Sequence, residues 1–206
     1  MAHETATRSF LIAIITAAPL ALAAINQAVA CACCTNPGQR NVGVAKLDTY
    51  KQAQIDELRF AAAAQLFVGE AETSDVKGIA TPSEHYTLDA GWQKDKLVFA
   101  LRDEAGHSGT LSFQRPSTVS VFEVDPRDDA REGGNGPGLY KEWKLTAKAA
   151  GSGVFSPGLG PSQLLSLIVQ GRGNSCTSSS DFTHWTLVMQ GPKANYTLFG
   201  KLVTTP

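Results

Sequence analysis

The sequence has no surplus of charge of either sign. Its 206 residues include 18 lysines and arginines against 19 aspartates and glutamates, which gives a formal net charge of −1 at pH 7. No stripe of basic residues with interleaved aromatic side chains occurs along the chain. Proteins that bind nucleic acid or an anionic membrane surface concentrate positive charge in one region. The composition therefore argues against a nucleic-acid partner.

A hydrophobic run long enough to cross a membrane as a helix is also missing. The apolar stretch 10–25 is shorter than the roughly 20 residues that a helix needs to span a bilayer. Arg8 precedes this stretch, and Ala28-Val29-Ala30 fits the small-x-small rule of a signal-peptide cleavage site. We therefore expect residues 1–30 to be a signal peptide and the mature chain to be exported, to the periplasm or the extracellular space.

Cysteine is scarce, and three of the four cysteines lie together. Cys31, Cys33 and Cys34 begin the predicted mature chain, and Cys176 lies in a distant polar loop. An oxidising compartment favours disulfides over persistent thiols. We expect a disulfide from Cys33 or Cys34 to Cys176, which would stabilise the fold by roughly 4–5 kcal/mol in the chain-entropy model. Cys31 is also a candidate for lipidation, which would make the protein a membrane-anchored lipoprotein, although Ala28 stands where such signals usually have leucine.

The same thiols leave a metal site open as an alternative. Thiolates are soft ligands that suit Cu(I) or Zn(II), but the paired Cys-x2-Cys spacing of structural zinc sites is absent. A disulfide and a thiolate site exclude each other in one molecule, because the disulfide consumes the ligands. We therefore expect no cofactor, with Cu(I) or Zn as the alternative. The candidate ligands for that alternative are Cys31, Cys33, Cys34, Cys176 and His184.

No motif in the sequence specifies catalysis. Asp181 precedes His184 by three residues, and with Cys176 these residues superficially resemble a cysteine-histidine-acid set, but sequence proximity does not bring a base within reach of a nucleophile. Residues 106–109 read Gly-His-Ser-Gly, which lacks the Gly-x-Ser-x-Gly spacing and lies in a predicted hairpin turn. The acidic stretch 125–129 lacks the spacing of a calcium-binding loop. We predict that the chain is not an enzyme.

Alternation of apolar and polar residues predicts an all-β fold. A period of two recurs between glycine- and proline-rich segments, and no βαβ spacing occurs. At most one short helix is predicted, at 48–54 near the N-terminus. The pattern indicates a single-domain antiparallel β-sandwich or barrel. The predicted strands are 57–69, 86–91, 96–102, 110–114, 119–125, 139–149, 165–170, 183–190 and 196–203.

The expected organisation is a signal peptide (1–30), a cysteine-containing N-terminal arm (31–50) and a β domain (51–206). The leading hypothesis for function is an exported, non-enzymatic module with a structural or interaction role, whose cysteine cluster is tethered to the Cys176 loop. A soft-metal-binding protein and a β-barrel that binds a small molecule are the alternatives. In a closed barrel six aromatic residues would line a ligand cavity, although core packing is their commoner role: Trp92, Trp143, Trp185, Tyr140, Phe182 and Phe199.

Overall fold

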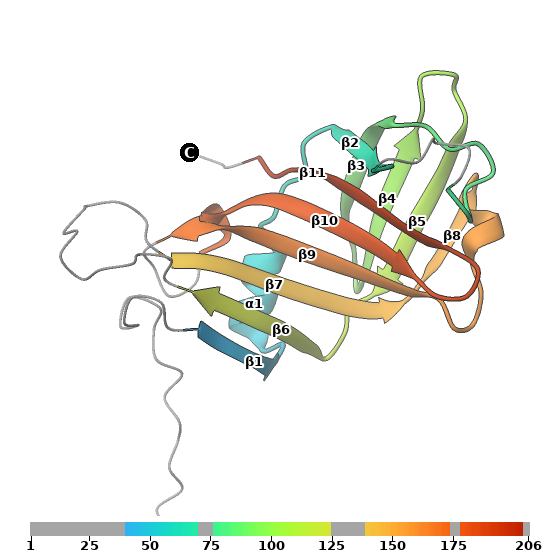
Figure 1. Cartoon of the computed structure of the whole chain (residues 1–206). Coiled ribbons are helices and arrows are strands. Elements are labelled where there is room, and N and C mark those ends of the chain that lie inside the picture. Colours follow the sequence, from blue (N-terminus) through green and yellow to red (C-terminus); the bar gives the residue numbers. More distant parts are fainter. Residues whose placement is uncertain (1–39, 70–75, 125–138, 174–177, 204–206) are drawn as a thin grey trace, which may run out of the picture.

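One antiparallel sheet makes up most of the described chain. The computed structural model describes residues 40–69, 76–124, 139–173 and 178–203 (Figure 1). Within this part of the chain, eleven strands, one α-helix and two short 3-10 helices occur. In chain order they are β1 (Arg40–Lys46), α1 (Thr49–Asp56), β2 (Ala63–Phe67), β3 (His85–Gln93), β4 (Lys96–Arg102), β5 (Ser108–Gln114), β6 (Thr118–Val124), β7 (Leu139–Lys148), β8 (Ala150–Gly153), η3 (Ser156–Gly158), β9 (Leu164–Gly173), η4 (Ser179–Asp181), β10 (Phe182–Gln190) and β11 (Asn195–Lys201).

The sheet bends so that its two parts enclose one core. The strand order is β1-β6-β7-β9-β10-β11-β2-β3-β4-β5-β8, with every neighbouring pair antiparallel. In Figure 1, β6 and β7 lie to the lower left of β3, β4 and β5, and the right-hand parts of β9 and β10 pass in front of the lower ends of β4 and β5. Leu167 of β9 and Phe99 of β4 are both fully buried and belong to the same hydrophobic cluster. The predicted all-β antiparallel fold is confirmed.

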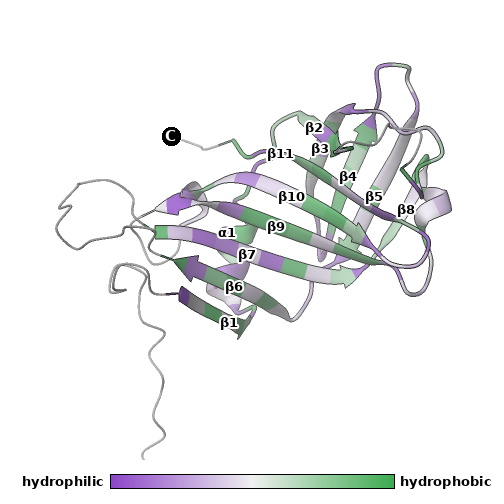
Figure 2. Ribbon diagram, viewed as in Figure 1, coloured by the Kyte–Doolittle hydropathy of each residue, from purple (hydrophilic) through white to green (hydrophobic). Residues whose placement is uncertain are grey.

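The alternation of side chains decides which face of each strand meets this core. In β10, Trp185, Leu187 and Met189 are at most 1% exposed, whereas the residues between them are partly exposed. Figure 2 shows hydrophobic and hydrophilic residues alternating along β7. In β7 one inward position holds a charged residue, Lys141, between buried apolar neighbours. The period of two thus identifies the core face of these strands.

Helix α1 has a side-chain cap at its N-terminus. The carboxylate of Asp48 accepts a hydrogen bond from the backbone N–H of Lys51 at 2.9 Å and pairs with the Nζ of the same residue at 2.8 Å. This cap satisfies an N–H group that the first helical turn leaves unpaired. Ile55, 1% exposed, anchors α1 in the core. The helix predicted at 48–54 is confirmed, and in the described residues no helix has the length and apolarity needed to cross a membrane.

Two strands lie where the sequence predicted none. β1 falls within the stretch expected to form an N-terminal arm, and its seven residues pair with β6 as part of the sheet. β8 falls in a glycine-rich segment, 150–153, that lies outside every predicted strand. A Cβ atom on Gly151 would lie 2.1 Å from the carbonyl oxygen of Thr110 in β5. The absence of a side chain at Gly151 therefore allows β8 to approach β5.

One predicted strand is shorter in the structure than in the prediction. The sequence predicted a strand over 57–69, but β2 covers only Ala63–Phe67. α1 ends at Asp56, and Phe60 forms only an isolated bridge with Leu202. Apart from the Phe60 bridge, residues 57–62 therefore connect α1 to β2 without forming part of a strand.

Candidate functional site

Four strands, β1, β6, β7 and β9, are in register at one end of the sheet, and two of them, β1 and β9, adjoin the cysteine-containing stretches. Arg40 of β1 pairs with Val124 of β6. Tyr140 of β7 lies next to Val124, and Arg172 of β9 lies next to Tyr140. Adjacent strands are about 4.8 Å apart, so these four residues span about 14 Å. We call this line of residues, 40, 124, 140 and 172, the Arg40 row (Figure 1).

The cysteines are close in the sequence to the two ends of the Arg40 row, Arg40 and Arg172. Cys34 precedes Arg40 by six positions (34 to 40), and Cys176 follows Arg172 by four (172 to 176). An extended chain advances at most about 3.3–3.6 Å per residue, so the two segments together reach further than the width of the row. The described strands thus leave the predicted disulfide within reach. All four cysteines, Cys31, Cys33, Cys34 and Cys176, lie outside the described residues, as do the predicted signal peptide (1–30) and the acidic stretch 125–129.

A buried lysine lies one residue inside the Arg40 row. Lys141 of β7 is 1% exposed, and its Nζ donates a hydrogen bond of 2.5 Å to Oδ2 of Asp181 in η4. Glu123 of β6 is the register partner of Lys141 and is also buried. A buried charge without a partner of opposite sign would cost several kcal/mol. We call Glu123, Lys141 and Asp181 the buried ionic cluster.

The two carboxylates of the buried ionic cluster have different environments. Burial raises the pKa of Glu123, and the positive charge of Lys141 only partly opposes that rise. Asp181 receives the direct hydrogen bond from Lys141. Gly173 at the end of β9 makes room for it, because a Cβ atom there would lie 2.0 Å from Cγ of Asp181. The ion pair therefore depends on a glycine as well as on the two charged residues.

η4, which follows the Cys176 stretch, is also fixed to α1. The backbone N–H of Ser179 donates to Oε1 of Gln54 at 2.7 Å, and the Ser179 hydroxyl donates to Oε2 of Glu57 at 2.7 Å. A cleft of about 340 Å³ lies between the end of α1 and η4, with Arg59 and Ser180 among its lining residues. The point at which the chain re-enters the fold after Cys176 is thus held from both α1 and β7.

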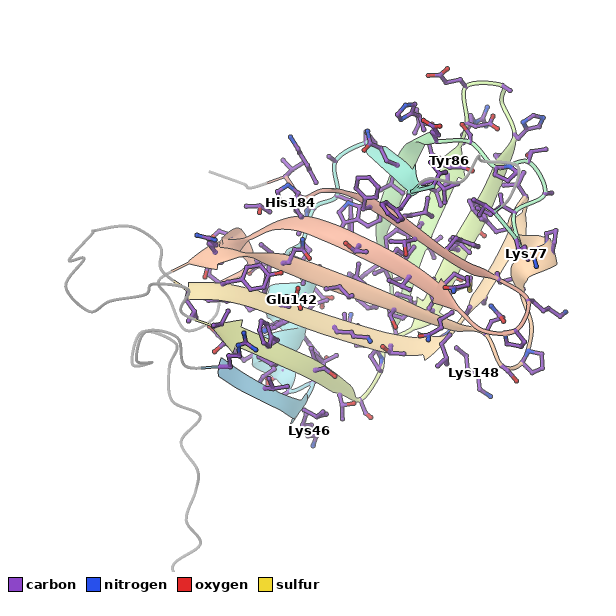
Figure 3. All side chains as sticks on the ribbon, viewed as in Figure 1. Lys46, Lys77, Tyr86, Glu142, Lys148 and His184 are labelled. Atoms are coloured by element: carbon purple, nitrogen blue, oxygen red, sulfur yellow. The ribbon has the colours of Figure 1, made fainter. Side chains whose placement is uncertain are left out.

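Asp181 and His184, which the sequence placed three residues apart, have different partners. Asp181 is bonded to Lys141, whose side chain is on the core face of β7. His184 is exposed on β10, with its Nδ1 2.9 Å from Oγ1 of Thr183 (Figure 3). The next strand position, Trp185, is buried, so His184 projects from the outer face of the sheet. The structure therefore does not assemble these two residues as an acid and a base.

The six aromatic residues proposed for a ligand cavity do not share one face of the sheet. Trp143 and Phe182 pack together with ring centroids 5.3 Å apart, and Trp185 packs on Phe60 at 5.8 Å. Trp143, Phe182 and Trp185 are each at most 2% exposed. Tyr140 and Phe199 alternate with buried neighbours and so lie on the outer face, whereas Trp92 packs edge-on against Phe113. Trp143, Phe182 and Trp185, which face inward, therefore pack in the hydrophobic core.

An aspartate–histidine pair that the sequence analysis missed closes the β4–β5 hairpin. The carboxylate of Asp103 accepts the backbone N–H of His107 at 2.8 Å and contacts its ring Nδ1 at 2.9 Å. Burial raises the pKa of Asp103, but the hydrogen bonds from His107 outweigh it, so that the pKa lies below its ordinary value. A hairpin turn is confirmed here, but Ser108 and Gly109 already belong to β5. The spacing of four residues across the turn was the signal for the pair.

No family model, curated protein or solved structure matches this chain. Nor does the described part of the chain contain three or more histidine, cysteine, aspartate or glutamate side chains grouped to hold a metal ion. The fold, the Arg40 row and the buried ionic cluster are therefore the features of this chain that bear on its function.

Proposed function

We propose that the protein is an exported, non-enzymatic interaction module whose N-terminal cysteine cluster is tethered to the Cys176 loop. The Arg40 row carries this proposal, because it brings the segments that precede Arg40 and follow Arg172 to the same end of the sheet. A disulfide between them would fix the N-terminal segment to the β7–β9–β10 part of the fold.

The charged side chains near the Arg40 row support a stabilising role more than a catalytic one. A general acid or base must reach its substrate, and a nucleophilic amine must be accessible. Lys141 is 1% exposed and bonded to Asp181. The hydroxyl of Tyr140 donates to the carboxylate of Glu142. These contacts order the end of the sheet and favour a module that presents a surface.

Non-reducing peptide mapping of the natively exported protein tests the tether. We expect a mature N-terminus at Cys31 and a peptide in which Cys33 or Cys34 is joined to Cys176. Alkylation of all four cysteines in the metal-free protein would show that the tether is absent. A mass at Cys31 increased by acyl groups would establish a lipid anchor.

Elemental analysis separates this function from soft-metal binding. We expect protein purified under anaerobic, chelator-free conditions to contain no stoichiometric metal, since a disulfide removes two of the thiolate ligands. Stoichiometric copper or zinc, lost in a Cys33→Ser/Cys34→Ser variant that still folds, would favour the metal-binding alternative instead.

A further inference from the structure

β1 is an open edge strand with exposed apolar side chains. It ends the strand order and, among the described strands, pairs with β6 alone. Val42 and Val44 are 77% and 73% exposed, the highest values among the large hydrophobic residues of the described chain. Proteins usually blunt or cover such an edge, because it can pair with a strand of another chain. β1 lies at the lower margin of the sheet in Figure 1.

The backbone of the two valines is directed to the open edge. The N–H of Leu47 donates to the carbonyl of Ser117 at 2.9 Å, which continues the β1–β6 ladder by one residue. Bonded pairs alternate in an antiparallel ladder, so Ala45 and Gly43 also turn their N–H and C=O groups toward β6. The N–H and C=O groups of Val42 and Val44 therefore point away from β6.

Positive charges flank the two valines. Alternate residues of a strand share a face, so Arg40 and Lys46 project from the same face as Val42 and Val44. Both charged residues are exposed, and Figure 3 shows Lys46 at the lower margin of the molecule. On the same face, the partly buried ring of Phe122 in β6 lies next to Val42. Along this face of β1 the side chains are thus, in order, charged, apolar, apolar and charged.

We propose that β1 binds an extended segment of another protein by strand addition, and that the segment has the pattern acid-x-apolar-x-apolar-x-acid. Its backbone would bond to Val42 and Val44, and its apolar side chains would cover theirs. Its carboxylates would lie opposite Arg40 and Lys46, where unlike charges stabilise a cross-strand pair. This inference rests on the proposed interaction role and specifies the chemistry of the partner.

Charge argues against a second copy of this chain as the occupant. Two β1 strands pairing antiparallel about Gly43 would place Val42 of each copy opposite Val44 of the other. The same register would place Arg40 of each copy opposite Lys46 of the other. Like charges directly opposite each other destabilise a strand pair. The partner that complements both ends of β1 is therefore acidic.

Two labelled peptides test the charge pattern on the full mature protein. One is acetyl-Glu-Thr-Val-Thr-Val-Thr-Glu-amide, and the other has lysine in place of both glutamates. By fluorescence anisotropy we expect the acidic peptide to bind about fivefold more tightly than the lysine peptide, because it forms two favourable cross-strand charge pairs. An Arg40→Glu/Lys46→Glu variant should reverse that preference.

A proline variant tests the backbone contact. Val44→Pro removes an N–H that points to the open edge and leaves the bonds to β6 in place, which edge strands tolerate. We expect it to bind the acidic peptide about tenfold more weakly than wild type. Val44→Ile, which keeps the N–H and the branched side chain, is the matched control and should bind like wild type. If Val44→Pro does not fold, the charge-reversal variant still decides.

Three results would overturn the strand-addition proposal. The first is equal or no binding of the two peptides, and the second is binding unaffected by a folded Val44→Pro protein. The third is strong protection of the Val42 and Val44 amides from hydrogen exchange without peptide, which would mean that the edge is already covered by this chain or a second copy. Loss of the Cys176 tether would leave all these measurements interpretable, so the two proposals fail separately.

Discussion

Lys141 of β7 and Asp181 of η4 form an ion pair with 2.5 Å between Nζ and Oδ2. The side chains are 1% and 14% exposed, so water screens the pair only weakly. Asp181 lies where the chain re-enters the fold after Cys176, and Lys141 follows Tyr140 of the Arg40 row. The pair therefore fixes η4, where the chain re-enters the fold after Cys176, to β7.

Removing the carboxylate that accepts the hydrogen bond of Lys141 should destabilise the fold strongly. Asp181→Asn leaves a buried ammonium group next to Glu123, and we expect a loss of about 3–5 kcal/mol in the free energy of unfolding at pH 7. Urea unfolding followed by tryptophan fluorescence measures it. The double variant Lys141→Met/Asp181→Asn should recover most of the loss, because methionine suits the apolar inward row. A double variant as unstable as the single one would contradict this interpretation.

Glu123 should make the stability depend on pH in the opposite sense to a salt-bridged carboxylate. Burial raises its pKa above the ordinary value of 4.5, so the folded state binds the proton more tightly than the unfolded state. Its contribution is fully present below pH 4.5 and is lost as the pH rises through the folded-state pKa. Relative to wild type, Glu123→Gln should therefore gain stability as the pH rises above 4.5.

Urea midpoints at several pH values check this prediction for Glu123. Glu84→Gln, which removes an exposed carboxylate, is the control for the substitution itself. A Glu123→Gln variant whose difference from wild type does not change with pH would show that Lys141 fully compensates the burial of this carboxylate.

Alternation predicted the strands whose two faces differ in polarity, and it failed where they do not. In β10 the row of Trp185, Leu187 and Met189 contrasts with its neighbours, and the strand was located from the sequence. In β1 the outward residues Val42 and Val44 are more hydrophobic than the inward Gly43 and Ala45. That reversal hides an edge strand from any rule that places the apolar row inside. The same reversal is what exposes the proposed binding edge.

The buried ionic cluster was visible in the sequence only as an interruption. Lys141 breaks the apolar row of β7, but its partner Asp181 lies 40 residues further along, and no local pattern connects them. The sequence analysis instead compared Asp181 with His184, which is near in the chain, and predicted no catalytic set from them. η4 ends at Asp181 and β10 begins at Phe182, so the two side chains belong to elements of different geometry. Only the three-dimensional fold shows that Lys141 and Asp181 lie close together.

Gln163 should be important for the β10–β11 hairpin. Its amide is fully buried, with Nε2 donating to the carbonyl of Ala194 at 3.1 Å and Oε1 accepting from the N–H of Lys193 at 2.9 Å. Gln163→Leu leaves both backbone groups unpaired, and we expect a loss of about 2–4 kcal/mol. Thermal unfolding measures it. Gln190→Leu, on the exposed end of β10, is the control and should change stability little; equal losses in the two variants would contradict the role of Gln163.

Cys176 should contribute to stability through its bond to the N-terminal cysteines, and not through a metal. A link from Cys33 or Cys34 to Cys176 closes a loop of about 140 residues, whose removal should cost roughly 4–5 kcal/mol in the chain-entropy model. Cys176→Ser should therefore lower the urea midpoint of the oxidised protein, and a reductant should lower that of wild type by the same amount. The reductant should have no further effect on the variant. A wild-type midpoint that is insensitive to reductant but falls when a chelator is added would show that the thiols hold a metal, because only then would their contribution depend on the ion and not on the sulfur–sulfur bond.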